Sequence, residues 1–133
     1  MWPPNVERIA AALRAAGVEG RLEELSKDAR VPPGPAVRAE TYDCDGRRVV
    51  ALIPVDRDLD RSKLARAARC SALRPVDPLR FPFTNAVVVL ERIVLVEPAV
   101  WIEAGSPRHA VALAPAQLVD LANAQTADLV TDS

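Results

Sequence analysis

Apolar residues are most concentrated between residues 85 and 109. Two runs, 87–90 and 93–96, consist mainly of valine and isoleucine and are separated only by Glu91 and Arg92. β-Branched side chains favour pleated, buried positions over helical ones. The pattern therefore predicts two buried strands, or one bent strand, followed by another strand at residues 100–102.

Three other segments carry the signals of helices. In residues 5–16 the apolar positions recur on one face, with Asn5 as a cap and Gly17 as the terminator. Asp60 can cap a second helix at residues 60–68, and Pro115 begins a third at the position that proline favours. About three helices are therefore expected.

The remaining apolar runs are short and bounded by turn residues. Asp45-Gly46 between two such runs is a strong hairpin signal, and the proline-rich residues 31–35 form a stiff linker. The expected strands are residues 21–25, 36–42, 47–54, 110–113 and 127–130, and residues 71–80 are expected to be irregular. The sequence thus predicts an α/β fold (mixed α+β), a curled, partly barrel-like mixed β-sheet flanked by about three helices.

Length and composition indicate how many domains the chain forms and where in the cell it is expected. A chain of 133 residues, half of them apolar, fits one domain over residues 1–133. No apolar run approaches the ~20 residues that cross a bilayer, and the first residues lack the pattern of a signal peptide. The two cysteines, Cys44 and Cys70, imply neither a disulfide framework nor a cysteine-based zinc site. A cytoplasmic location without membrane contact is expected.

The net charge of −1 argues against strong non-specific binding to DNA or other nucleic acids. The charge is uneven, however. Residues 37–80 carry ten basic and seven acidic side chains, whereas the residues after Arg80 carry two basic and six acidic ones. The local basic excess fits either a polyanion docking on one side or an ordinary solvated surface.

The turn that follows residues 100–102 is the most favourable place for chemistry. Gly105-Ser106-Pro107 is permissive for the backbone and leads to His109, the single histidine. It is either a substrate-contacting turn or a plain one. Ser106 with His109 as its base would make a nucleophilic pair, yet the two need not face each other and no third member is evident. A lone histidine such as His109 is more often structural.

Two other positions have a functional and a structural interpretation. Glu91 interrupts an apolar strand, and a buried carboxylate must be paired or hydrogen-bonded. It either binds a substrate amine or pairs with an arginine. Phe81 and Phe83 either line an amino-acid pocket or belong to the core.

Several stretches together resemble one known family. They are the helix VERIAAALRAAGVEG, the segment GPAVR at residues 34–38, DGRRVVALIPVDRDLD at residues 45–60, and VWIEAGSPRHAVALAPAQL at residues 100–118. In this order the chain resembles the YbaK/prolyl-tRNA synthetase-associated domain family, as a divergent and shortened member. Members of this type hydrolyse the ester of a mischarged aminoacyl-tRNA. No metal or organic cofactor is implied.

The resemblance also implies a set of site residues. Arg38 stands where the family has a lysine on the strand after the linker, and Gly105 with Ser106 and Pro107 matches its Gly-x-Pro turn. Phe83 and Thr84 fall at the end of its Pro-Phe-Gly loop. The implied catalytic residues are Arg38 and Gly105, and the implied substrate-binding residues are Phe83, Thr84, Glu91, Ser106, Pro107 and His109.

This chain departs from the family pattern at the same site. Arginine stays protonated and cannot act as a general base, although it can donate to an oxyanion or a phosphate. Thr84 replaces the glycine of the loop, Val55 replaces a glycine after the hairpin, and Glu91 stands where many relatives have aspartate. These losses fit a divergent deacylase or a protein that has kept the fold without the reaction.

Three functions remain open at this point. The first is an editing enzyme that acts in trans on the 3′ end of a mischarged aminoacyl-tRNA. The second is a catalytically silent module of the same fold that binds tRNA or an aminoacyl-tRNA synthetase. The third is an interaction protein that forms a homodimer through an exposed sheet edge or helix face. The amino acid and the tRNA are not indicated by the sequence.

Overall fold

The computed structural model describes residues 2–26 and 32–132 of the chain. Within those ranges it has three α-helices, one short 3₁₀ helix and two β-sheets, of three and five strands. The predicted mixed α/β class with about three helices is therefore confirmed. The strands do not curl into one partly closed barrel, because they divide between two open sheets. Val31, in the predicted linker, lies outside the described residues.

The five-stranded sheet is built on the predicted hairpin. β2 and β3 pair along their whole length, and the Asp45-Gly46 turn between them has positive φ angles of 52° and 91°, as a tight hairpin turn requires. β5 joins β3 in parallel, and β8 joins β5 in parallel. The order is β4-β2-β3-β5-β8, with bounds β2 Val37–Cys44, β3 Arg47–Pro54, β4 Leu73–Pro75, β5 Val87–Glu91 and β8 Gln125–Ala127.

The smaller sheet is antiparallel, in the order β1-β7-β6. Its strands are β1 (Arg21–Glu24), β6 (Val100–Ser106) and β7 (His109–Leu113). It touches the larger sheet through an isolated bridge between Ala36 and Trp101, where the backbone N–H of Trp101 donates to the carbonyl of Pro35 at 2.8 Å. The chain just before β2 therefore holds the two sheets together.

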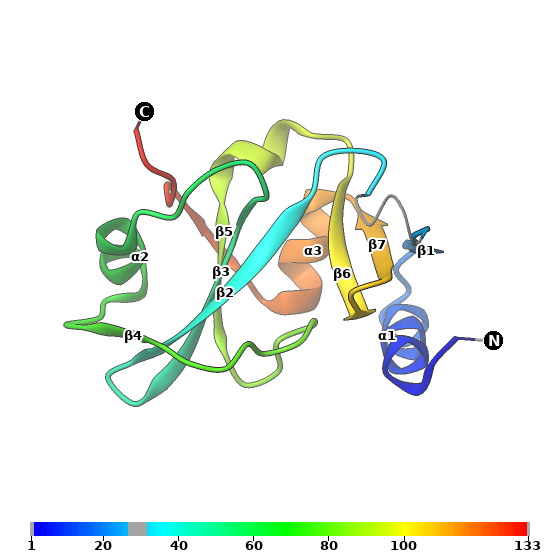
Figure 1. Cartoon of the computed structure of the whole chain (residues 1–133), viewed down its shortest axis with the longest axis horizontal. Coiled ribbons are helices and arrows are strands. Elements are labelled where there is room, and N and C mark those ends of the chain that lie inside the picture. The colour runs from blue at the N-terminus through cyan, green and yellow to red at the C-terminus, as the bar shows by residue number, and fades with distance from the viewer. Residues whose placement is uncertain (1, 27–31, 133) are drawn as a thin grey trace.

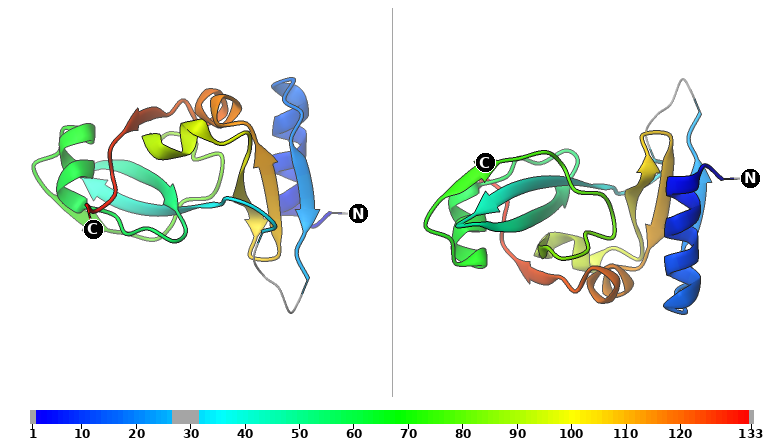
Figure 2. Two further views of the ribbon diagram at one scale, coloured as in Figure 1. Left: turned by 90° about the horizontal axis from the view of Figure 1, so that it is seen from above. Right: turned by 90° about the horizontal axis from the view of Figure 1, so that it is seen from below.

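The helices lie around these sheets. α1 (Pro4–Ala15) and α2 (Arg61–Ala68) are at opposite ends of the molecule, beside the smaller and the larger sheet respectively (Figures 1 and 2). Asp60 caps α2 as predicted, accepting hydrogen bonds from the backbone N–H groups of Ser62 and Lys63. α3 (Pro115–Ala122) begins with proline, also as predicted.

Both faces of the larger sheet are buried, because neighbouring residues of a strand face opposite sides. In β3, Val50 and Leu52 join the core shared with α1, α3 and the smaller sheet. Val49, Ala51 and Ile53 join a second core beneath α2. This division decides which side chains can reach a ligand site between the two sheets.

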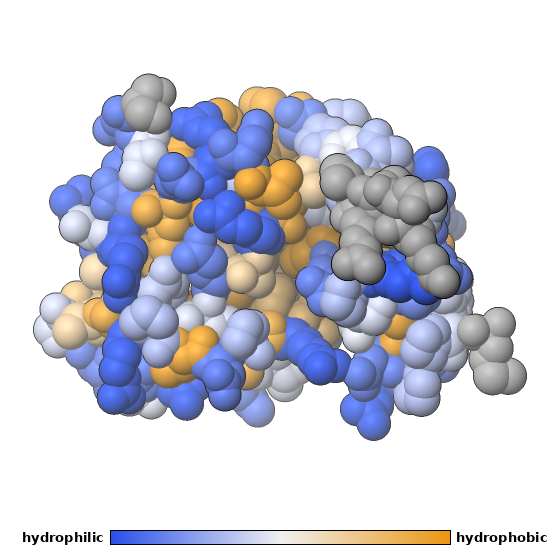
Figure 3. Space-filling view, in the orientation of Figure 1, coloured by the Kyte–Doolittle hydropathy of each residue, from blue (hydrophilic) through white to orange (hydrophobic). Residues whose placement is uncertain are grey.

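Residues 93–96 do not form the predicted strand. They belong to a 3₁₀ helix, η1 (Arg92–Val96), because the Glu91 carboxylate accepts a hydrogen bond from the backbone N–H of Ile93 and closes a turn directly after β5. Only Val94 is buried, whereas Val96 is 83% exposed. Apolar atoms accordingly reach the surface along the upper edge of the molecule (Figure 3), in the region of η1.

Two short strands also differ from the prediction. Residues 71–80, predicted to be irregular, contain β4, which extends the sheet beside β2. The strand predicted at residues 127–130 ends at Ala127 instead, and Val130 makes only an isolated bridge with Leu59. Short edge strands depend on their neighbours rather than on their own sequence.

The expectation for the cysteines is wrong. Cys44, at the end of β2, and Cys70, two residues after α2, form a disulfide with their Cα atoms 5.5 Å apart. The bond joins the hairpin tip to the end of α2 across a separation of 26 residues. The number of cysteines did not predict this disulfide. Two cysteines so far apart in sequence meet only because the β2–β3 hairpin packs beneath α2.

Candidate functional site

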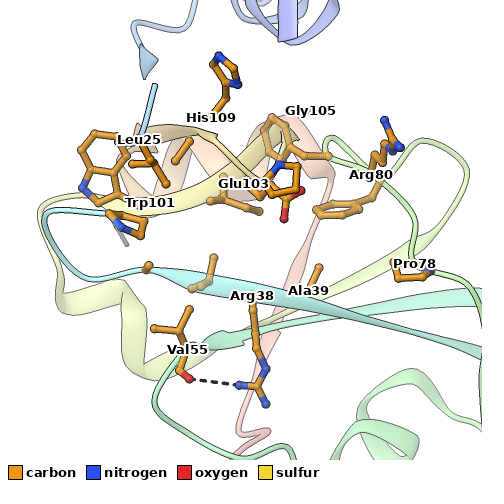
Figure 4. Close-up of a pocket in the computed structure, with 18 of the residues that line it drawn as sticks. Leu25, Arg38, Ala39, Val55, Pro78, Arg80, Trp101, Glu103, Gly105 and His109 are labelled. Carbon is orange, nitrogen blue, oxygen red and sulfur yellow. Dashed lines mark hydrogen bonds between the residues drawn. The ribbon is translucent and has the colours of Figure 1, made fainter. Parts of the chain in front are cut away.

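A cavity of about 540 Å³ lies between the two sheets. Three segments form most of its walls: the start of β2, the loop at residues 78–83, and the β6–β7 hairpin (Figure 4). Leu25, Pro32 and Val55 complete the lining. Its volume is in the range of small-molecule sites, about 300–1,000 Å³. The cavity brings Arg38, Phe83, Gly105, Pro107 and His109 of the predicted site residues to one place.

Aromatic side chains form much of the wall contributed by the loop. Phe81 and Phe83 are 6% and 4% exposed and pack edge to face with ring centres 5.8 Å apart. The loop is held against β2 by the backbone N–H of Leu79, which donates to the hydroxyl of Thr41 at 3.1 Å. Phe83 therefore lines the cavity and also belongs to the core. Thr84 lies outside the cavity, in an adjoining hollow.

Gly105 forms a tight corner where β6 meets α1. Its φ angle is 88°, and a Cβ atom built there would lie 2.8 Å from the backbone carbon of Asn5. Glycine is thus required by both the backbone conformation and the close approach. Ala104 and Gly105 also fall between the strand pairs Glu103–Ala110 and Ser106–His109, a bulge that takes their backbone groups out of the regular ladder.

The guanidinium of Arg38 does not point into the cavity. It donates to the carbonyl of Arg57 at 2.9 Å and to the Glu40 carboxylate at 2.9 Å. Arg38 alternates along β2 with Val37 and Ala39, which face the core between the sheets. Figure 4 shows its side chain directed away from Gly105, so only the β2 segment around it borders the cavity.

Arg38 belongs instead to a polar network on the α2 side of the sheet. Glu40 accepts a hydrogen bond from the hydroxyl of Tyr42 at 2.8 Å, and the guanidinium of Arg61 lies 5.0 Å from the centre of the Tyr42 ring. Burial, with the hydrogen bond and negative charge of Glu40, raises the pKa of Tyr42 to about 12. The sequence gives one signal of this arrangement, the alternation of Arg38, Glu40 and Tyr42 on one face of a strand.

Glu91 lies away from the cavity and is 1% exposed. Its carboxylate accepts hydrogen bonds from the backbone N–H groups of Ile93 at 2.5 Å, Leu129 at 2.7 Å and Val130 at 3.3 Å. These contacts start η1 and fasten the C-terminal segment to β5. Neither alternative raised by the sequence, a substrate amine or a paired arginine, describes this geometry.

Ser106 and His109 do face each other. Ser106 Oγ and His109 Nδ1 are hydrogen-bonded at 2.6 Å, and the backbone N–H of Arg108 also donates to Ser106 Oγ. The two residues are directly paired across the β6–β7 hairpin, which places their side chains on one face. In Figure 4, however, the imidazole points away from Arg38 and Val55, and its ring packs edge-on against Trp2 at 5.5 Å.

Most of the cavity residues were not predicted as site residues, and three of these have polar or charged side-chain atoms. Trp101 and Glu103 come from β6, and Arg80 comes from the loop. Trp101 and Glu103 are separated by two positions, the spacing of one face of a strand, and this spacing could have identified them. Among the residues that the structure describes, no three His, Cys, Asp or Glu side chains are grouped as metal ligands. No helix in the described part of the chain is long and apolar enough to cross a membrane.

Comparison with known proteins shows which solved structures share the fold of this chain. No protein-family model and no curated protein matches the sequence. A solved structure of a candidate trans-editing enzyme for prolyl-tRNA synthetase is similar, with a TM-score of 0.85 and 22% identity, over 99% of this chain and all of that one. A structure from work on epitope grafting onto scaffold proteins has a TM-score of 0.85 and 23% identity over the same shares.

A larger protein contains a unit of similar structure. A candidate signal transduction protein from Marinobacter aquaeolei matches 98% of this chain with a TM-score of 0.73 and 19% identity, and the match covers 31% of that protein. At these identities the likeness shows the fold alone. It supports a YbaK-like fold for this chain.

Proposed function

We propose that this protein edits aminoacyl-tRNA by hydrolysing the ester of a mischarged tRNA in trans. The observation that carries the proposal is the cavity between β2, the loop at residues 78–83 and the Gly105 turn, on a fold similar to that of a candidate trans-editing enzyme for prolyl-tRNA synthetase. Phe81, Phe83 and Trp101 supply apolar walls suited to a small side chain.

The reaction would depend on positioning. An aminoacyl ester is already activated, so a held water and donors aimed at the developing oxyanion suffice. Gly105 lies outside the regular strand pairs and lines the cavity, and its backbone N–H group is the proposed donor. Pro107 would limit the mouth of the cavity, and Ser106 with His109 would hold the shape of the turn through their hydrogen bond.

Arg38 has a different place in this proposal from the one the resemblance implies. Its guanidinium would have to leave Arg57 and Glu40, and pass to the other face of β2, before it could touch an ester in the cavity. The proposed role of Arg38 is therefore to fix the segment at residues 55–57 beside the cavity. Hydrolysis would then survive the loss of its side chain.

The test is deacylation of a panel of mischarged tRNAs by three proteins: the native chain, Ala39→Phe and Arg38→Ala. Ala39 lines the cavity, so the added ring should obstruct part of it and lower turnover strongly. Arg38→Ala should keep activity within about threefold of the native rate, less than the tenfold that 1.4 kcal/mol represents. Equal thermal stability of the native protein and Ala39→Phe is the control for folding.

No turnover of any ester by the native protein would remove the enzyme proposal. The geometry of Arg38 and His109 then favours the second candidate, a silent module that binds tRNA or a synthetase, since the guanidinium of Arg38 and the imidazole of His109 are both hydrogen-bonded to partners within the protein. Binding of uncharged tRNA that weakens with salt, without turnover, would support that module.

A further inference from the structure

A second hollow of about 320 Å³ adjoins the cavity. The two spaces have five wall residues in common, from the loop before β5 and from the Gly105 corner: Leu79, Arg80, Phe81, Phe83 and Gly105. The other residues of its lining are Asn5, Arg8 and Ile9 of α1, with Pro82 and Thr84 of the loop. A ligand extending out of the cavity past Gly105 therefore enters this hollow.

The hollow is positively charged. Its lining contains two arginines, Arg8 and Arg80, and no acidic side chain. Both arginines are exposed, and within residues 2–26 and 32–132 neither guanidinium has an ion pair or a hydrogen bond. Arg14, on the same helix as Arg8, is by contrast paired with Glu7 at 2.9 Å. Two free guanidinium groups, one from α1 and one from the loop, that line one hollow are suited to an anion.

We infer that this hollow binds a backbone phosphate of the RNA whose 3′-terminal ester occupies the cavity. The inference rests on the proposed function, because that function puts a polynucleotide end in the cavity. Guanidinium groups bind phosphate oxygens through two parallel hydrogen bonds. Arg8 from α1 and Arg80 from the loop would hold the phosphate from two sides, and Asn5 and Thr84 offer further polar contacts.

A phosphate site would explain why threonine, rather than the glycine of the resembled family, stands at position 84. A glycine at that position would supply only backbone, whereas a threonine hydroxyl beside Arg80 is a donor for a phosphate oxygen. Thr84 is exposed, and it lines the hollow rather than the cavity. Its substitution should therefore change RNA affinity rather than the handling of the amino acid.

The experiment measures binding, separately from hydrolysis. A fluorescein-labelled RNA hairpin with an unpaired, uncharged 3′ end is titrated with protein at salt concentrations from about 50 to about 200 mM. The proteins are the native chain, Arg8→Gln, Arg80→Gln and the double variant. Arg66→Gln is the matched control, since Arg66 is an exposed arginine of α2 at the other end of the molecule.

Each single variant should weaken binding about fivefold to tenfold at low salt and lower the slope of log K against log salt by about 0.7. Arg66→Gln should leave both quantities unchanged. Equal losses in the control and in the two hollow variants would overturn the inference, because the effect would then be one of net charge. Binding by the native protein that none of the variants changes would overturn it as well.

These outcomes are separate from those of the hydrolysis assay. Deacylation by the native protein with unchanged KM in Arg8→Gln and Arg80→Gln would refute the phosphate site and leave the editing proposal standing. Salt-dependent hairpin binding that needs both arginines, in a protein that hydrolyses no ester, would support the phosphate site and refute editing.

Discussion

Reduction of the Cys44–Cys70 disulfide is expected to lower the free energy of unfolding by an amount that depends on the length of the loop it closes. The bond closes a loop with a sequence separation of 26 residues, which contains the end of β2, all of β3 and α2. The loss of loop-closure entropy in the unfolded chain corresponds to about 3.5 kcal/mol at 25 °C. For a chain of this length that corresponds to a fall of about 12 °C in Tm.

The assay is urea unfolding followed by tryptophan fluorescence, with and without a reductant, and with a Cys44→Ala/Cys70→Ala variant. The oxidised native protein should unfold at the highest urea concentration, and the reductant should remove most of the difference. The double variant should be insensitive to the reductant, which separates the disulfide from other effects of reducing conditions. It should also lose slightly more stability than reduction alone costs, since Cys44 is fully buried and alanine leaves a small cavity.

Two observations would refute this reasoning. Equal unfolding midpoints for the oxidised and reduced native protein would mean that the bond contributes no stability. Titration of two free thiols in the folded protein, purified without reductant, would mean that the pair does not form. A compact denatured state would reduce the effect without removing it, because part of the loop-closure entropy is then already lost before folding.

Two further predictions concern buried polar groups. Glu91→Ala should destabilise the fold by about 3 kcal/mol or more, because three backbone N–H groups lose a buried charged acceptor; a loss below about 1 kcal/mol in urea unfolding would contradict this role. Tyr42, the single tyrosine, should ionise near pH 12 in an absorbance titration, and Glu40→Gln should lower that value. The folded phenol keeps its proton above the ordinary pKa of 10.0, so the free energy of unfolding should fall as pH rises from about 10 to about 12.

Much of the fold follows from local signals in the sequence. The Asp45-Gly46 turn, the Asp60 cap and Pro115 at the start of α3 each act within a few residues, and all three occur as predicted. Residues 93–96 show the limit of that approach. Their composition favours a strand, but the side chain of Glu91 caps the next turn and starts a helix. A side chain that bonds its own backbone outweighs β-propensity there.

The site was less predictable because its residues meet only through tertiary contacts. The sequence placed Phe83, Gly105 and Pro107 at the site, and they line one cavity. It could not show that Gly105 presses against the backbone of Asn5, 100 residues earlier in the chain. Nor did it show that Ser106 and His109 are bonded, since that depends on the hairpin closing with those two residues directly opposed.

The charged residues of the candidate site divide into two groups with different consequences. Glu91 stood out in the sequence because it interrupts an apolar run, and Arg38 because it stands at the lysine position of the resembled family. Both are satisfied by partners within the protein. Arg8 and Arg80 lie in unremarkable polar segments and have no such partner in the described structure. Side chains already engaged in the fold stabilise it, whereas free guanidinium groups beside a cavity remain available to a ligand. If the protein acts on an RNA-linked ester, charge should therefore act mainly in binding the RNA, and the cavity should accelerate hydrolysis by its shape and its backbone donor.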